Sequence, residues 1–201
     1  MQNFPLIVGI SGASGVIYGI RLLQILRQIG VPSHLVMSHA AEVTLAHETD
    51  WKIADVKALA DSVHPIGDIA AAPASGSFRT RGMVIAPCSI RTMSEIATGM
   101  TTSLLTRAAD VMLKERRRLV LMVRETPLHT GHLRSLTALS EMGAIIAPPV
   151  PAFYAHPQSL AEMVDHSIVR VLDLFDVEMP GLRRWGPEKS APLRARGGET
   201  D

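Results

Sequence analysis

Short apolar runs alternate with longer segments of helical periodicity along this 201-residue chain. The runs are rich in β-branched residues and almost continuously apolar, which is typical of parallel strands covered by helices on both faces. The five runs lie at residues 6–10, 33–37, 82–87, 118–123 and 143–149. Helical spacing occupies 16–29, 40–48, 53–61, 90–98, 102–116, 130–142 and 158–175. This order predicts a three-layer α/β fold with a doubly wound, mostly parallel sheet.

Small and polar residues follow four of the five predicted strands. The segments are SGASG at 11–15, SHA at 38–40, PCSIRT at 87–92 and RETP at 124–127. Ligands of doubly wound sheets gather beyond the carboxyl ends of the strands. We therefore interpret these four segments as parts of one site.

Composition narrows the classes of partner. Twenty Lys and Arg residues against 19 Asp and Glu give a net charge of +1, so we expect neither nucleic acid nor a membrane surface as partner. No apolar run approaches the roughly 18 residues of a membrane helix. A single cysteine and an N-terminus without a signal-peptide pattern favour the cytoplasm.

We expect one domain over 1–187 and a C-terminal tail, 188–201, that is flexible or packed on a neighbouring subunit.

The glycine-rich turn after the first strand is a candidate anion site. Gly9, Gly12 and Gly15 are spaced three apart, which matches neither the glycine pattern of dinucleotide sites nor the Lys-bearing loop of ATP and GTP enzymes. A helix that begins at small residues presents backbone N–H groups to an anion, and Ser11 and Ser14 add hydroxyl donors. The alternative is a tight turn that serves only strand–helix packing.

The end of the second strand bears on the kind of nucleotide. An NAD site places an acidic residue there to hold the ribose, whereas this chain has Ser38 and His39. A mononucleotide with one phosphate fits the sequence better.

Four basic residues are candidates for binding a second anion: Arg107, Lys114, Arg124 and Arg170. Arg170 interrupts an apolar helix face, so we expect its guanidinium to be buried and to need a phosphate or carboxylate partner. For the remainder of the basic run at 116–118, a solvated helix end is the favoured interpretation.

Acidic, histidine and cysteine side chains supply further candidates. Glu48 and Glu125 lie at the ligand side of the predicted sheet and are candidate proton carriers. His129 and His132 share a helix face by their spacing, but no third ligand accompanies them, so we predict no metal. For Cys88 we favour a buried structural thiol over a nucleophile.

Nine motifs in order resemble those of the UbiX-type flavin prenyltransferases. They extend from about Leu6 to Gly186 and read GISGASG, LVMSHAA, HETD, PASGS, VIAPCSIRT, LLTRAADVMLKERR, LVLMVRETPL, PPVPAFY and RRWG. The resemblance implies a Rossmann-like flavoprotein that binds FMN and, once the FMN is reduced, transfers a dimethylallyl group from dimethylallyl phosphate to its N5 and C6. The product, prenylated FMN, would go to a UbiD-type partner decarboxylase in ubiquinone synthesis or aromatic-acid decarboxylation. The family also implies a homo-oligomer, a dodecamer with sites between subunits.

The resemblance also assigns roles to residues of this chain. The implied FMN contacts are Gly12, Ala13, Ser14, Ser38, Ser89, Ile90, Arg91, Thr92 and Arg124. The implied contacts of the donor phosphate are Lys114, Arg124, Glu125, Tyr154 and Arg170, some from adjacent subunits. Arg107 and Trp185 match further family positions.

The implied reaction suits the candidate chemistry. Glu48 is suited to removing the C6 proton and Glu125 to protonating the departing phosphate, with Ser14 close to the donor. The chain has no Asp-Asp-x-x-Asp motif to hold magnesium, and a cluster of Lys and Arg can stabilise the leaving phosphate instead.

The chain departs from the family pattern at two places. His39 stands where relatives often carry Lys, and the chain lacks an aromatic residue that some relatives have before Pro73, which bears on donor preference.

Two other functions are alternatives to the transferase. A flavin-dependent decarboxylase of the phosphopantothenoylcysteine type is one, but its lid needs a late cysteine and none follows Cys88. The second alternative is a protein that carries FMN to a partner without catalysing a reaction.

Overall fold

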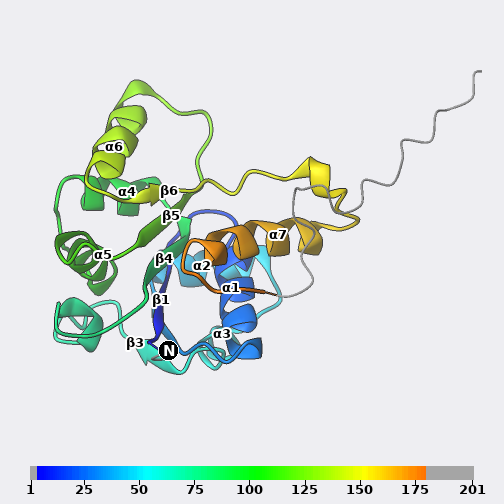
Figure 1. Ribbon diagram of the computed structural model, residues 1–201, viewed down its shortest axis with the longest axis horizontal. Coiled ribbons are helices and arrows are strands. Elements are labelled where there is room, and N and C mark those ends of the chain that lie inside the picture. The colour runs from blue at the N-terminus through cyan, green and yellow to red at the C-terminus, as the bar shows by residue number, and fades with distance from the viewer. Residues whose placement is uncertain (1–3, 180–201) are drawn as a thin grey trace, which may run out of the picture.

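The computed structural model describes residues 4–179, in which six parallel strands form one sheet between two layers of helices (Figure 1). The strands are β1 (Leu6–Ile10), β2 (Ser33–Met37), β3 (Ser62–His64), β4 (Gly82–Cys88), β5 (Leu119–Val123) and β6 (Ile145–Ile146). Their order is β3-β2-β1-β4-β5-β6, and every neighbouring pair is parallel. This is the doubly wound order, and it confirms the predicted fold class.

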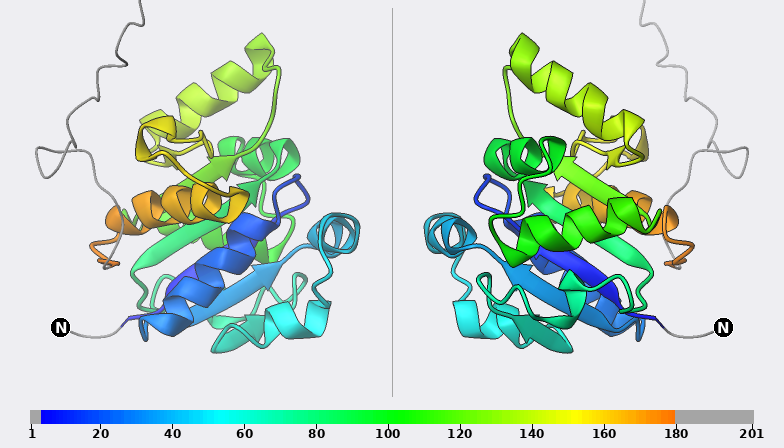
Figure 2. Two further views of the ribbon diagram at one scale, coloured as in Figure 1. Left: turned by 90° about the vertical axis from the view of Figure 1, so that its right-hand side faces the viewer. Right: turned by 90° about the vertical axis from the view of Figure 1, so that its left-hand side faces the viewer.

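Residues 4–179 contain seven α-helices. They are α1 (Ile17–Gln28), α2 (His39–Glu48), α3 (Ile53–Lys57), α4 (Ile90–Ala97), α5 (Leu104–Lys114), α6 (Thr130–Glu141) and α7 (Leu160–Asp173), and two short 3-10 turns, η1 (Ala72–Ala74) and η2 (Phe153–Ala155), lie in the connections. Figure 2 shows α1 and α7 on one face of the sheet and α4 and α5 on the other. Among the described residues, 4–179, no helix is long and apolar enough to cross a membrane.

The central strand shows why its sequence is apolar throughout. Leu6, Val8 and Ile10 belong to the core beneath α1 and α7, whereas Ile7 belongs to the core beneath α4 and α5. Successive side chains of a strand point to opposite faces, so a strand between two helical layers needs apolar residues at every position. All five residues of β1 are buried.

The strand at one edge was not predicted. Ser62–His64 has polar residues at two of its three positions and no apolar run, because it pairs with β2 alone and is only partly covered. The last strand is also shorter than the predicted 143–149, because Gly143 lies in the turn after α6 and the chain leaves the sheet after Ala147, whose N–H donates to the carbonyl of Leu121 at 2.9 Å. The other four strands agree with the predictions to within one residue.

Candidate functional site

The site lies where β1 and β4 adjoin, because the winding of the sheet reverses between them. Ser11 connects the ends of these strands. Its buried hydroxyl donates to the carbonyl of Pro87 at 2.9 Å and accepts from the N–H of Ser89 at 2.7 Å. The prediction that this hydroxyl would serve a ligand is wrong, since its proton is committed to the backbone.

The turn after β1 does bind an anion, and this anion is a side-chain carboxylate of the protein itself, that of Glu48. Oε2 of Glu48, the last residue of α2, accepts from the N–H of Gly15 at 2.8 Å and from that of Val16 at 3.2 Å. Val16 is the N-cap residue of α1, where the helix has no side-chain cap of its own. Two of the N–H groups expected to face a phosphate therefore bind a carboxylate instead.

The surroundings of Glu48 keep it ionised. Partial burial raises the pKa of this carboxyl, but hydrogen bonds from the Ser14 side chain and the two backbone N–H groups, with the nearby charge of Arg124, lower the pKa below its usual 4.5 overall. The structure thus brings Ser14, Glu48 and Arg124 together. The carboxylate is therefore ionised at neutral pH, and its lowered pKa makes it a weak base.

Close packing accounts for Gly12 and backbone conformation for Gly15. A Cβ at Gly12 would overlap that of Ala40 in the first turn of α2, and Gly15 has a φ of +97°, which L side chains rarely adopt. Ser38, the N-cap residue of α2, accepts from the N–H of Ala41 at 3.1 Å, and its own N–H donates to the carbonyl of Ile10 at 3.0 Å. The predicted turn at 12–14 and Ser38 are therefore neighbours.

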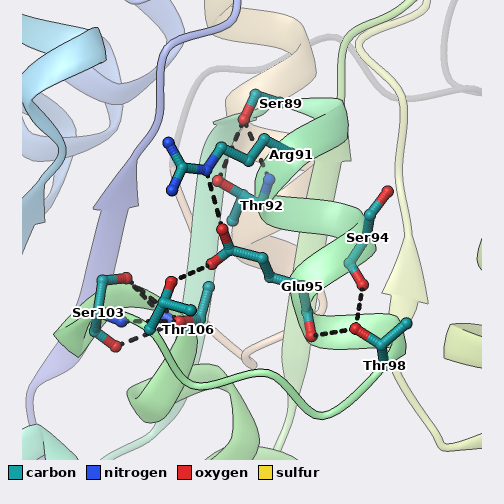
Figure 3. A network of polar contacts seen from close by, with 9 residues as sticks. Ser89, Arg91, Thr92, Ser94, Glu95, Thr98, Ser103 and Thr106 are labelled. Carbon is teal, nitrogen blue, oxygen red and sulfur yellow. Dashed lines mark hydrogen bonds and ion pairs between the residues drawn. The ribbon is translucent and has the colours of Figure 1, made fainter.

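The segment Ser89–Thr92 begins α4 at the end of β4. The Ser89 hydroxyl accepts from the N–H of Thr92 at 3.3 Å and donates to its hydroxyl oxygen at 3.1 Å (Figure 3). Arg91 extends outward with its side chain 85% exposed, and its Nε donates to Glu95 at 2.9 Å. The structure therefore places the start of α4 beside Ser11 and the turn after β1, as the single-site interpretation expected.

Glu95, which the sequence did not single out, bonds the predicted site residue Arg91. Its second carboxylate oxygen accepts from the hydroxyl of Thr102 at 2.6 Å, so it connects Arg91 to the segment that leads into α5. Burial raises the pKa of Glu95, but the bonds from Thr102 and Arg91 outweigh it and lower that pKa. Its i, i+4 spacing from Arg91 is the signal that could have found it.

Arg124 and Glu125 follow β5 and are exposed. The N–H of Arg124 donates to the carbonyl of Cys88 at 3.1 Å, which fixes its backbone at the end of β4. Glu125 accepts from the N–H of the next residue, Thr126, at 3.0 Å. Both predicted residues thus lie on the ligand side of the sheet.

A cavity of about 250 Å³ lies between α7 and the segment 147–154. Its apolar lining comes from both elements and from Met122, whereas its polar lining is Tyr154, His166, Ser167 and Arg170. The structure thus brings together Tyr154 and Arg170, two of the residues expected at the donor phosphate. They reach the cavity from segments that the sequence separates by 16 positions.

Arg170 differs from its prediction. Its side chain is 57% exposed instead of buried, and its Nη1 bonds Asp173 at 2.6 Å. The apolar side chains around it in the sequence lie on the inner face of α7, whereas Arg170 lies at the edge of that face. An arginine can cover apolar surface with its stem and keep its head in water, so an interruption of an apolar face does not require burial.

Lys114 and Arg107 are not part of this arrangement within one chain. Lys114 ends α5 and bonds Glu115 at 2.6 Å, and both lie against Gly76, near the starts of β4 and β5 and thus at the opposite end of the sheet. Arg107 bonds Asp110 at 2.7 Å, one turn along the same helix. Trp185 and the tail at 188–201 lie outside the described residues.

The remaining candidates have structural roles. The His129 ring accepts from the N–H groups of Gly131 and His132 and so caps α6, and it stacks on the His132 ring at 3.5 Å. Cys88 is buried, which raises the pKa of its thiol and agrees with the structural interpretation. Within residues 4–179, no group of three or more His, Cys, Asp or Glu side chains could hold a metal ion.

Comparison with known proteins gives a consistent result. A protein-family model described as Flavoprotein matches residues 1–173. The flavin prenyltransferase UbiX of Thauera aromatica is 56% identical over 95% of this chain and 99% of its own length, and that of Escherichia coli K12 is 61% identical over 90% and 97%.

Solved structures agree. A crystal structure of AnUbiX (PadA1) in complex with FMN and dimethylallyl pyrophosphate superimposes with a TM-score of 0.91 at 47% identity, covering 94% of this chain and all of the other. A dodecameric FMN-dependent UbiX-like decarboxylase from Escherichia coli O157:H7 gives 0.88 at 50% identity, covering 90% and 99%. With the fold, the switch-point site and these relatives in agreement, the chain belongs to the flavoprotein family and, within it, to the UbiX flavin prenyltransferases.

Proposed function

We propose that this chain transfers the dimethylallyl group of dimethylallyl phosphate to N5 and C6 of reduced FMN. The observation that carries the proposal is the Glu48 carboxylate, which backbone N–H groups hold ionised beside Arg124 at the switch point of the sheet. Relatives named flavin prenyltransferases support the reaction class, and the AnUbiX complex with FMN supports the acceptor. The predicted transferase function and the FMN requirement are confirmed at the level of this family.

The residues at the switch point fit an FMN. Two helices, α2 and α4, begin there at the caps Ser38 and Ser89, and helix N-termini suit a single phosphate. Gly12 leaves no side chain between the turn and α2. We assign FMN binding to the predicted set, Gly12, Ala13, Ser14, Ser38, Ser89, Ile90, Arg91, Thr92 and Arg124.

Proton transfer follows from the two carboxylates. Bond formation at N5 needs no base, whereas closing the ring at C6 releases a proton, which Glu48 is placed to accept. Glu125 is assigned to protonating the departing phosphate and Ser14 to orienting Glu48. General-base catalysis of this kind contributes about 10²- to 10⁴-fold.

The donor phosphate is assigned to the cavity beneath α7. Arg170 and Tyr154 supply a cation and a hydroxyl there, which are the groups that an anionic leaving group needs in the absence of a metal. Lys114 lies at the other end of the sheet, so it would reach a donor only from a neighbouring copy. Association of copies is supported by the dodecameric relative, and we propose a homo-dodecamer whose product passes to a UbiD-type decarboxylase.

Anaerobic incubation with reduced FMN and dimethylallyl phosphate tests the proposal. The released flavin should gain the mass of the dimethylallyl group, and EDTA should leave the rate unchanged because the basic residues replace a metal. Parallel reactions contain no donor, or dimethylallyl pyrophosphate, which tests the preference for the monophosphate. An FMN carrier would return FMN of unchanged mass, and that result would refute the transferase assignment.

A further inference from the structure

His166 is a buried polar residue with no role in the proposed reaction. It lies on α7 one turn before Arg170, with 7% of its surface exposed. Its side chain lines the same cavity as Arg170 and Tyr154. The sequence analysis did not single it out, although its i, i+4 spacing from Arg170 places both on one helix face.

The geometry pairs His166 with Tyr154. The Nε2 of His166 is 3.4 Å from the phenolic oxygen of Tyr154, and the two rings meet edge to face with centroids 5.6 Å apart. Tyr154 is 43% exposed, so His166 forms the inner wall of the cavity and Tyr154 its rim. The contact joins η2 to α7 across the cavity.

An apolar residue would fill the position of His166 more simply. Much of the neighbouring lining is apolar and includes Pro148, Val171 and Leu174. A buried imidazole costs free energy unless its nitrogens are hydrogen-bonded. The adjacent Ser167 also lines the cavity, but its hydroxyl donates to the carbonyl of Met163 at 3.0 Å. Its proton is therefore not available to His166 or to a ligand in the cavity.

Counting protons indicates what the pair can do. If Nε2 carries the proton, it donates to the phenolic oxygen, and the phenolic proton can then be directed toward an anionic oxygen in the cavity. If Nε2 is unprotonated, the phenol donates to the imidazole and its single proton is used there. Only the first arrangement aims a donor at a phosphate beside Arg170.

We infer that His166 is a positioning residue of the donor subsite, whose Nε2–H holds Tyr154 so that the phenolic O–H binds the phosphate of the dimethylallyl donor. The inference rests on the proposed function, because it assigns the cavity to the donor. Through Tyr154, His166 affects the binding of the donor and leaves the later proton transfers to the two carboxylates.

Steady-state kinetics of four full-length proteins test the inference: parent, His166→Leu, Tyr154→Phe and the double variant. His166→Leu should raise KM for dimethylallyl phosphate about 3- to 10-fold, the scale of one neutral hydrogen bond, with kcat nearly unchanged. In the Tyr154→Phe background the same change should alter KM less than about twofold, because the bond it removes is already absent. His166→Gln keeps a side-chain N–H donor and should restore KM toward the parent value.

Several outcomes would overturn the inference. They are an equal effect of His166→Leu in both backgrounds, a loss confined to kcat, or a rise in KM for His166→Gln as large as that for His166→Leu. If His166→Leu does not fold, the comparison of His166→Gln with His166→Met decides, since methionine fills the space without an N–H. Failure of the proposed function is distinguishable, because the parent itself would then form no prenylated flavin.

Discussion

The turn after β1 and the cavity beneath α7 differ in the groups that they offer to a charged partner. At the turn, a carboxylate from one helix receives two backbone N–H groups at the start of another, over 2.8 and 3.2 Å. In the cavity, the polar groups all belong to side chains, and those of Tyr154 and Arg170 are partly in solvent. At the turn the fold fixes the two backbone donors and only the Glu48 side chain is free to rotate, whereas the cavity depends on the rotamers of several side chains.

This difference suits the two substrates. A flat, rigid flavin needs a fixed proton acceptor, and a group supported by backbone does not have to be ordered on binding. A small phosphate ester can be enclosed by side chains that adjust to it. The predictions that follow test whether the turn is the rigid catalytic part and the cavity the adaptable binding part.

Glu48→Gln should have the largest effect on the reaction. The amide keeps an oxygen that can accept from Gly15 but loses the basicity, so ring closure should slow by about 10²- to 10⁴-fold while FMN still binds. A singly attached flavin adduct should accumulate and be visible in its absorption spectrum. The matched control is Glu42→Gln, the same change on the same helix at a carboxylate that binds Lys57. Ring closure at the parent rate in Glu48→Gln would show that the turn does not hold the base.

Ser11→Ala should destabilise the turn side of the molecule. It removes the hydroxyl that joins β1 to the carbonyl of Pro87 and the N–H of Ser89, and we expect a loss of about 1–3 kcal/mol in the free energy of unfolding. Chemical denaturation measures it. Ser140→Ala, at an exposed position on α6, should change stability by less than about 0.5 kcal/mol. Equal effects would mean that the bridge contributes nothing to stability.

Arg170→Ala should weaken donor binding with little change in FMN binding. Because the guanidinium is 57% exposed and shared with Asp173, we expect roughly a tenfold rise in KM for dimethylallyl phosphate, below the effect of orphaning a buried pair. Arg79→Ala, which removes an exposed arginine three residues before β4, is the control and should leave KM unchanged. A parallel loss of FMN would assign Arg170 to the flavin or the fold.

The pH dependence of stability should show the smallest effect. The folded-state pKa of Glu48 lies below its usual 4.5, so the ionised form stabilises the native turn. This contribution is complete above 4.5 and is lost as the pH falls from there through the lowered pKa. The difference in unfolding free energy between parent and Glu48→Gln should therefore stay constant from neutral pH to about pH 5 and shrink below it. A difference that grows on acidification would contradict the sign.

The sequence predicts the parts of the molecule that repeat a pattern. Four strands and the order of helices follow from apolar runs, because a sheet covered on both faces allows few polar positions. The place of the site follows from the small residues after four strands. β3 could not be predicted in this way, because a short edge strand needs no apolar run.

Individual contacts in the site were harder to predict. The bond from Gly15 to Glu48 joins residues 33 positions apart, and no local pattern indicates it. The exposure of Arg170 and the burial of His166 depend on how α7 is rotated against the segment 147–154, a tertiary property. The i, i+3 spacing from Arg170 to Asp173 was visible in the sequence and could have supplied the partner.

The two edges of the sheet have a consequence for the chain in a crowded solution. An exposed strand edge offers unpaired N–H and C=O groups to which another chain can add, and this is a route to aggregation. Here the edges are the shortest strands, with three residues in β3 and two in β6, whereas the interior strands have five to seven. An incoming strand finds few backbone groups to pair with, so the fold discourages uncontrolled extension of its own sheet.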